Sequence, residues 1–177
     1  MDSIDFGRLQ RRARVSYEWA RFRRAFVGFS PALALVAIAV GVTPRPSSAI
    51  MFGTAMFCLG VGLLWYGQDL KRAVLPGLAA GAVPLATALC ANQIGHVCAG
   101  GSCMSFCLPA CVAGGAIAGI GFAMFGLQGK HGAPFLLAGS LLAFLTGAMG
   151  CACIGHAGLL GLAAGYGVGL LSGMKKA

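Results

Sequence analysis

The sequence predicts an all-α, polytopic membrane protein, a bundle of six transmembrane helices with both chain ends on the cytoplasmic side. The composition is 58% hydrophobic and only 10% charged, whereas soluble domains carry about 25% charged residues. Between Ala25 and Met174 only five residues are charged: Arg45, Asp69, Lys71, Arg72 and Lys130. Nearly the whole chain is therefore expected to lie inside a bilayer, in contact with lipid.

Six uncharged stretches approach or exceed the length of about 20 residues that crosses a hydrocarbon layer of roughly 30 Å. They are 25–42, 49–67, 73–94, 108–127, 133–149 and 154–173. No charge separates the last two, so the chain must turn near residues 150–153. The expected organisation is a basic arm over 1–24, a membrane domain over 25–174 and a tail over 175–177.

The net charge of +9 is explained by topology. Twelve of the thirteen Lys and Arg residues lie before the first span, after the second, after the fourth or after the sixth, and only Arg45 lies elsewhere. The positive-inside rule places those twelve in the cytoplasm. The chain is thus expected to be a multi-pass protein of the bacterial inner membrane, and its charge gives no reason to expect direct binding to nucleic acid.

The basic arm carries Phe6, Leu9, Ala13 and Tyr17 at near-helical spacing, with arginines on the other faces. One interpretation is a lipid-contacting helix whose cations pair with anionic headgroups. The other is a docking helix for a cytoplasmic protein. The residues expected to bind such a partner are Arg8, Arg11, Arg12, Arg14 and Tyr17.

Small residues recur at helical spacing within the spans. GxxxG motifs occur at 77–81, 115–119, 161–165 and 169–173, and such motifs let helix backbones approach closely. Packing within one chain is the favoured interpretation, and a homodimer through these faces is the alternative. The repeated GLAAG at 77–81 and 161–165 would also fit an inverted three-plus-three repeat.

Cysteine is concentrated at the predicted outer ends of the spans. Six of the eight cysteines lie there, together with two of the three histidines: Cys98, Cys103, Cys107, Cys111, Cys151, Cys153, His96 and His156. Cys90 lies about one helical turn below the same surface. Cys58, in the middle of a span, is expected to be a small buried hydrophobic residue.

Three interpretations of this periplasmic cluster compete. The first is a set of structural disulfides, because an oxidising compartment stabilises them. The second is a stable zinc or copper site, since thiolate and imidazole suit such metals. The third is a reversible sensor of soft metals or redox state. The candidate metal ligands are His96, Cys98, Cys107, Cys111, Cys151, Cys153 and His156.

Pro109 sharpens the expectation for two of the thiols. Proline disfavours helical geometry in the residue before it, so the fourth span should start near Pro109, with Cys107 just before it and Cys111 in its first turn. A helix N-terminus stabilises a thiolate. Cys107 and Cys111 are thus the expected reactive pair, and one of them should lie with its Cα within about 7 Å of that of Cys151 or Cys153.

Two absences narrow the function. There is no CxxC motif, so the chain does not look like a membrane thiol oxidase. Asp69 is the only carboxylate after Glu18 and lies at a membrane surface, whereas ion-coupled transporters usually need an acidic residue inside the membrane. No catalytic residues, and no enzymatic activity, are expected.

Three sets of residues carry a resemblance to a known family: Cys107-Leu108-Pro109, Ala133-Pro134 with Ala138-Gly139, and Gly147–Cys151 with His156. Over Cys107–Gly169 the chain resembles a bacterial family of six-span membrane anti-sigma factors. The resemblance implies that Cys107 and Cys151 or Cys153 are sensing thiols, and that the arm over Met1–Arg24 contacts an extracytoplasmic-function sigma factor. The departures are the short, strongly basic arm and the larger number of outer cysteines.

The sequence thus predicts a membrane protein whose outer Cys/His cluster senses soft metal or redox state and signals to a cytoplasmic partner such as a sigma factor. The alternatives are a small soft-metal-binding transport protein, with the cluster as its capture site, and a membrane scaffold with structural disulfides only.

Overall fold

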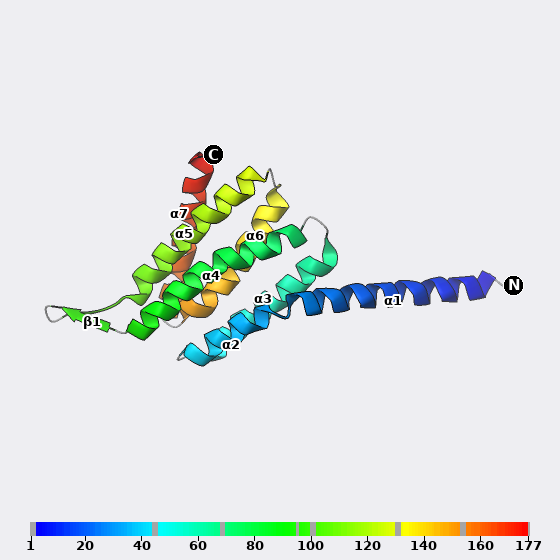
Figure 1. Cartoon of the computed structure of the whole chain (residues 1–177), viewed down its shortest axis with the longest axis horizontal. Coiled ribbons are helices and arrows are strands. Elements are labelled where there is room, and N and C mark those ends of the chain that lie inside the picture. Colours follow the sequence, from blue (N-terminus) through cyan, green and yellow to red (C-terminus); the bar gives the residue numbers. More distant parts are fainter. Residues whose placement is uncertain are drawn as a thin grey trace.

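The computed structural model describes residues 3–43, 46–67, 70–94, 96–99, 102–129, 132–152 and 155–176. Within these ranges the chain forms helices and one short β-hairpin (Figure 1). The helices are α1 (Ser3–Phe29), α2 (Ala32–Val42), α3 (Pro46–Tyr66), α4 (Lys71–Ile94), α5 (Cys107–Gln128), α6 (Ala133–Cys151) and α7 (His156–Lys176). Strands β1 (His96–Ala99) and β2 (Ser102–Ser105) pair antiparallel between α4 and α5.

Five of these helices, α3 to α7, are long and apolar enough to cross a membrane. The pair formed by α1 and α2 passes the same test when its two parts are taken together, and would make a sixth span. The chain is therefore a multi-pass helical membrane protein, and the predicted spans correspond closely to the helices. The largest difference at a helix start, apart from α1, is in α3, which begins at Pro46 rather than residue 49.

The first predicted span is bent. Helices α1 and α2 meet at an angle of 46° around Ser30 and Pro31, where the Pro31 nitrogen cannot donate a backbone hydrogen bond. Before this bend α1 is one continuous helix of 27 residues, so the basic arm and the start of the span are not separate elements. Figure 1 shows α1 projecting away from the other helices.

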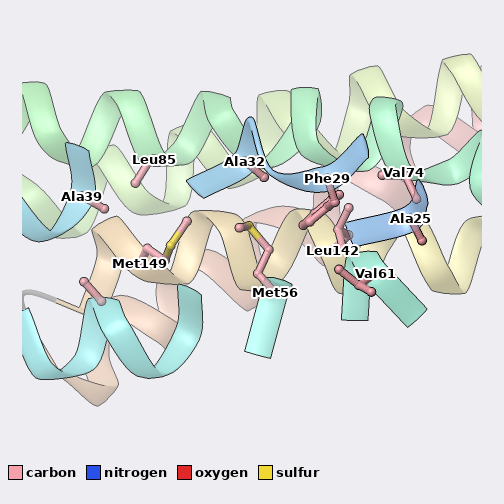
Figure 2. Packing of buried hydrophobic residues seen from close by; sticks show 11 residues of the cluster. Ala25, Phe29, Ala32, Ala39, Met56, Val61, Val74, Leu85, Leu142 and Met149 are labelled. Atoms are coloured by element: carbon pink, nitrogen blue, oxygen red, sulfur yellow. The ribbon is translucent and has the colours of Figure 1, made fainter. Parts of the chain in front are cut away.

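Helix α6 is the centre of the bundle and packs on α3, α4, α5 and α7. Its buried Leu142 and Met149 join a core cluster with Met56 of α3, Phe29 of α1 and other residues from α2 and α4. Figure 2 shows these side chains converging from helices that are distant in sequence. Burial of this cluster ties the first half of the chain to the second half.

Helices α5 and α7 approach each other through glycine. A Cβ atom on Gly115 would lie 2.8 Å from the Leu162 carbonyl oxygen, and a Cβ on Gly165 would collide with the Val112 carbonyl oxygen. On the other side of the bundle, a Cβ on Gly77 would lie 2.8 Å from the Gly139 carbonyl oxygen. The GxxxG motifs are thus used for packing within one chain, as the favoured interpretation predicts.

The inverted repeat stays unconfirmed. In such a repeat α4 and α7 would be counterparts, but α7 packs mainly along α5, whereas α4 packs mainly along α6. The GLAAG segment of α4 therefore lies on a helix that packs against α6, and that of α7 on a helix that packs against α5, which are not counterparts in such a repeat.

The helices begin and end at two opposite ends of the bundle (Figure 1), and the residues at these two ends differ in chemistry. The cysteine end holds the β-hairpin, the first turn of α5 and the last turn of α6. The basic end holds the first turn of α4 and the last turns of α5 and α7, with Lys71, Arg72 and Lys175 exposed there. The N-terminal half of α1 extends from the basic end, so its arginines add to the charge at that end.

Candidate functional site at the cysteine end

A disulfide joins Cys111 of α5 to Cys151, the last residue of α6. Their Cα atoms are 5.9 Å apart, although 40 positions separate them in the sequence. The predicted juxtaposition of one α5 cysteine with the turn after α6 is therefore confirmed for this pair. Two helices that are next to each other in sequence are covalently fixed where they reach the cysteine end.

This disulfide is fully buried, with both cysteines 0% exposed. It lies in a small core cluster with Ala88 of α4, Ala148 of α6 and Leu162 of α7. Of the expected reactive pair, Cys111 is thus bonded in this structure and Cys107 is free, and the sensing role of both stays a prediction.

Cys107 is a free, half-buried thiol at the start of α5. The helix begins at Cys107 itself, and its first turn includes Pro109. This corrects the predicted start near Pro109: proline is tolerated within a first turn because its missing N–H would have no helical partner there. Cys107 is thus the first residue of the helix and Cys111 lies in its second turn, on the same face.

The β-hairpin places further cysteines at the same end. Its register sets Cys98 opposite Cys103 and His96 opposite Ser105. Only the backbone of these residues falls within the described structure. The sequence predicts only that these cysteines lie at the outer ends of the spans, and the paired strands are an addition to that prediction.

The turn between α6 and α7 is short, as the absence of charge between the last two spans predicts. It contains Gly155, whose φ of 74° is readily adopted only by glycine, and the Gly155 N–H donates to the Ala152 carbonyl at 3.0 Å. His156 then begins α7 and is exposed. Cys153 lies outside the described residues.

The two remaining cysteines are free and exposed. Cys90 lies in α4, near the cysteine end. Cys58 lies on the outer surface of α3, which corrects its expected burial: the buried positions of this helix are Gly53, Met56, Gly60 and their neighbours on another face. In a spanning helix this outer surface faces lipid, where a thiol is as acceptable as in a protein core.

The described side chains contain no group of three or more His, Cys, Asp or Glu residues that could hold a metal ion. Cys111 and Cys151 cannot supply thiolates while they are bonded to each other. Of the seven candidate ligands, Cys107 and His156 are the only ones with a described side chain outside the disulfide. The zinc or copper site thus stays a prediction.

The basic arm is held at one point by polar contacts. The Trp65 indole N–H donates to the Glu18 carboxylate at 3.2 Å, and the Arg21 guanidinium donates to the Trp65 carbonyl oxygen. Trp65 also packs edge-on against Phe22, with ring centroids 5.8 Å apart. Beyond this anchor the predicted partner-binding residues Arg11, Arg12, Arg14 and Tyr17 are exposed, and only the backbone of Arg8 is described.

Packed side chains connect the disulfide to this anchor. Met149 lies two residues before Cys151, and its sulfur would be 3.3 Å from a Cβ placed on Gly53 of α3. Further along α3, the Phe29 ring of α1 covers Gly60, and the centroids of the Phe29 and Phe57 rings are 5.6 Å apart. The path from the disulfide to α1 therefore runs through α6 and α3.

Comparisons of this chain with protein-family models, with curated proteins and with solved structures find no match. What the chain does is therefore inferred from its own residues: a buried disulfide beside a free thiol at one end of a membrane bundle, and an exposed basic helix at the other.

Proposed function

We propose that the protein is a thiol-based redox sensor of the bacterial inner membrane, with the cysteine end in the periplasm and the basic end in the cytoplasm. The observation that carries the proposal is the Cys111–Cys151 disulfide with a free Cys107 one turn away on α5. The charge distribution supports the orientation, because the exposed Lys71, Arg72 and Lys175 share one end of the bundle with the arm.

Cys107 is the thiol that undergoes thiol–disulfide exchange with the buried Cys111–Cys151 bond. Cys107 attacks Cys151 as a thiolate, so that a Cys107–Cys151 bond forms while the Cys111–Cys151 bond breaks. Cys111 leaves as a thiolate and takes up the proton that Cys107 lost. A Cys107–Cys111 bond is disfavoured, because residues four apart on a helix hold their Cβ atoms about 5–6 Å apart, farther than the roughly 3.5–4.5 Å of a disulfide.

Complete reduction needs an external dithiol. Its two thiols supply two electrons and two protons, and it leaves as a disulfide while the protein gains two thiols. The ends of α5 and α6 are then no longer covalently fixed. The altered position of α6 is passed to α1 through the Met149–Gly53 and Phe29–Gly60 contacts.

The output is the exposed part of α1. Its arginines and Tyr17 suit an acidic surface on a cytoplasmic protein, and the resemblance to membrane anti-sigma factors makes a sigma factor the expected partner. A purely structural disulfide is the competing account, and the experiments below separate the two.

The direct test measures whether the disulfide controls the arm. The full-length protein in lipid nanodiscs is treated with dithiothreitol or left oxidised, and the rate of tryptic cleavage at Arg11, Arg12 and Arg14 is measured. Reduction should change this rate severalfold in the wild type and in the Cys58→Ser control. The Cys111→Ser/Cys151→Ser variant should be insensitive to reductant. An unchanged wild-type rate would leave a structural disulfide as the better account.

A cellular test separates sensing from transport. Deletion of residues 1–14 should abolish a transcriptional response to periplasmic oxidant while leaving metal accumulation unchanged. Loss of metal accumulation with an intact transcriptional response would instead support a transport protein.

A further inference from the structure

A groove opens between α4 and α5 toward the basic end. It has a volume of about 460 Å³ and is lined almost wholly by apolar atoms, within the range of about 300–1,000 Å³ typical of ligand sites. The lining residues are Leu75, Pro76, Ala79, Ala80, Val83, Ile117, Ala118, Gly121, Phe122 and Phe125.

The groove exists because the contact between the two helices changes along their length. Near the cysteine end they touch closely: the Thr87 hydroxyl donates to the Ala110 carbonyl at 3.3 Å, and a Cβ on Gly114 would lie 2.9 Å from the Pro84 Cα. Toward the basic end they diverge (Figure 1). Ala79 and Ala80 of α4 and Ala118 and Gly121 of α5 are small, so the space between the bulkier lining residues stays open to the side.

Two exposed cations stand at the mouth of the groove. Lys71 and Arg72 lie in the first turn of α4. Leu75 follows Lys71 by four residues and Pro76 follows Arg72 by four, so each lies on the same face of the helix as its cation. From Leu75 to Val83 the groove follows α4 for about 12 Å, most of the roughly 15 Å that one leaflet contributes to the hydrocarbon layer. Positive charge at the headgroup level is thus continuous with an apolar slot at acyl-chain depth.

We infer that this groove binds an anionic phospholipid. One acyl chain lies in the slot between Ala79 and Gly121, and the phosphate-bearing headgroup pairs with Lys71 and Arg72. The site is independent of the cysteines and does not rest on the redox proposal.

Native mass spectrometry of the full-length protein with phosphatidylglycerol or phosphatidylcholine of identical acyl chains tests the inference. Wild-type protein should bind phosphatidylglycerol about thirtyfold more tightly, which corresponds to about 1 kcal/mol for each of the two cations. Lys71→Gln/Arg72→Gln should reduce that binding to the level of phosphatidylcholine.

The slot itself is tested with a matched pair of glycines. A Cβ on Gly121 or on Gly167 meets nothing within 4 Å, but only Gly121 lines the groove. Gly121→Leu should weaken binding of both lipids severalfold, whereas Gly167→Leu should not, and inorganic phosphate should fail to displace the bound lipid. Equal effects of the two variants, or no lipid preference in the wild type, would overturn the inference. A dimer that only Gly121→Leu dissociates would identify the occupant as a second copy of the chain.

Discussion

Thr146 and Met56 meet in the middle of the bundle, where the Thr146 hydroxyl lies 3.2 Å from the Met56 sulfur. Both residues are 0% exposed, and the same hydroxyl donates to the Leu142 carbonyl at 2.8 Å. This contact joins α6, which ends in Cys151, to α3, on which α1 rests.

The Thr146 site should tolerate loss of polarity but not gain of volume. Thr146→Val leaves no buried group unpaired and should change stability by less than about 1 kcal/mol. Thr146→Leu should cost about 1–3 kcal/mol by overpacking, since a Cβ on Gly81 would already lie 2.6 Å from the Thr146 Cβ. Thermal unfolding in detergent measures both variants. Equal unfolding temperatures for them would show that the site is loosely packed.

Gly165 and Gly167 form a second matched pair. A Cβ on Gly165 collides with the Val112 carbonyl oxygen, whereas one on Gly167 meets nothing within 4 Å. Gly165→Ala should therefore force α5 and α7 apart and lower stability by about 1–3 kcal/mol, while Gly167→Ala should be neutral. The measurement is the Tm of each purified variant, and a neutral Gly165→Ala would contradict the close approach of the two backbones.

The disulfide predicts opposite outcomes for two neighbouring cysteines. Cys111→Ser removes the covalent link, which typically contributes about 2–4 kcal/mol, and leaves Cys151 as a new free thiol. Cys107→Ser should preserve the link and the Tm. Alkylation without reductant, followed by peptide mass spectrometry, counts the free thiols. Alkylated Cys151 in unreduced wild-type protein would exclude this pairing.

Trp65→Phe tests the anchor of the arm. Phenylalanine keeps the ring contact with Phe22 but cannot donate to Glu18, so we expect a loss of about 1 kcal/mol and faster tryptic cleavage at Arg23 and Arg24. Tyr66→Phe, at an exposed neighbouring ring, serves as the control. If both variants are cleaved at the wild-type rate, the Glu18 contact does not hold the arm.

The spans were predictable because lipid imposes a simple rule: uncharged stretches of sufficient length, such as the one that became α6, can hardly be anything else. The pairing of Cys111 with Cys151 was predictable only as one of several combinations, since several cysteines lie near the helix ends at the same membrane depth. The remaining contacts depend on which face each helix turns toward its neighbours. Hydropathy does not predict these faces, because core and lipid-facing positions in this chain are equally apolar.

Cys58 and Pro109 show where local reasoning fails. A thiol at a mid-span position carries no signal that distinguishes lipid from core, so the expected burial of Cys58 was wrong. At Pro109 the preference of the preceding residue for extended backbone was outweighed by the formation of a first helical turn, which begins with the Ala110 N–H bonded to the Phe106 carbonyl at 3.1 Å.

The bend at Ser30 and Pro31 gives the arm mechanical leverage. From Phe29 back to Gln10 the chain is unbroken helix, a rod of about 29 Å whose inner end is seated in the bundle and whose outer end is free of it. A tilt of roughly 10° at the bend would move Gln10 by about 5 Å. The same tilt would pull Glu18 away from Trp65, so a displacement at the Phe29 seat reaches the arginines at full amplitude only when this contact is released.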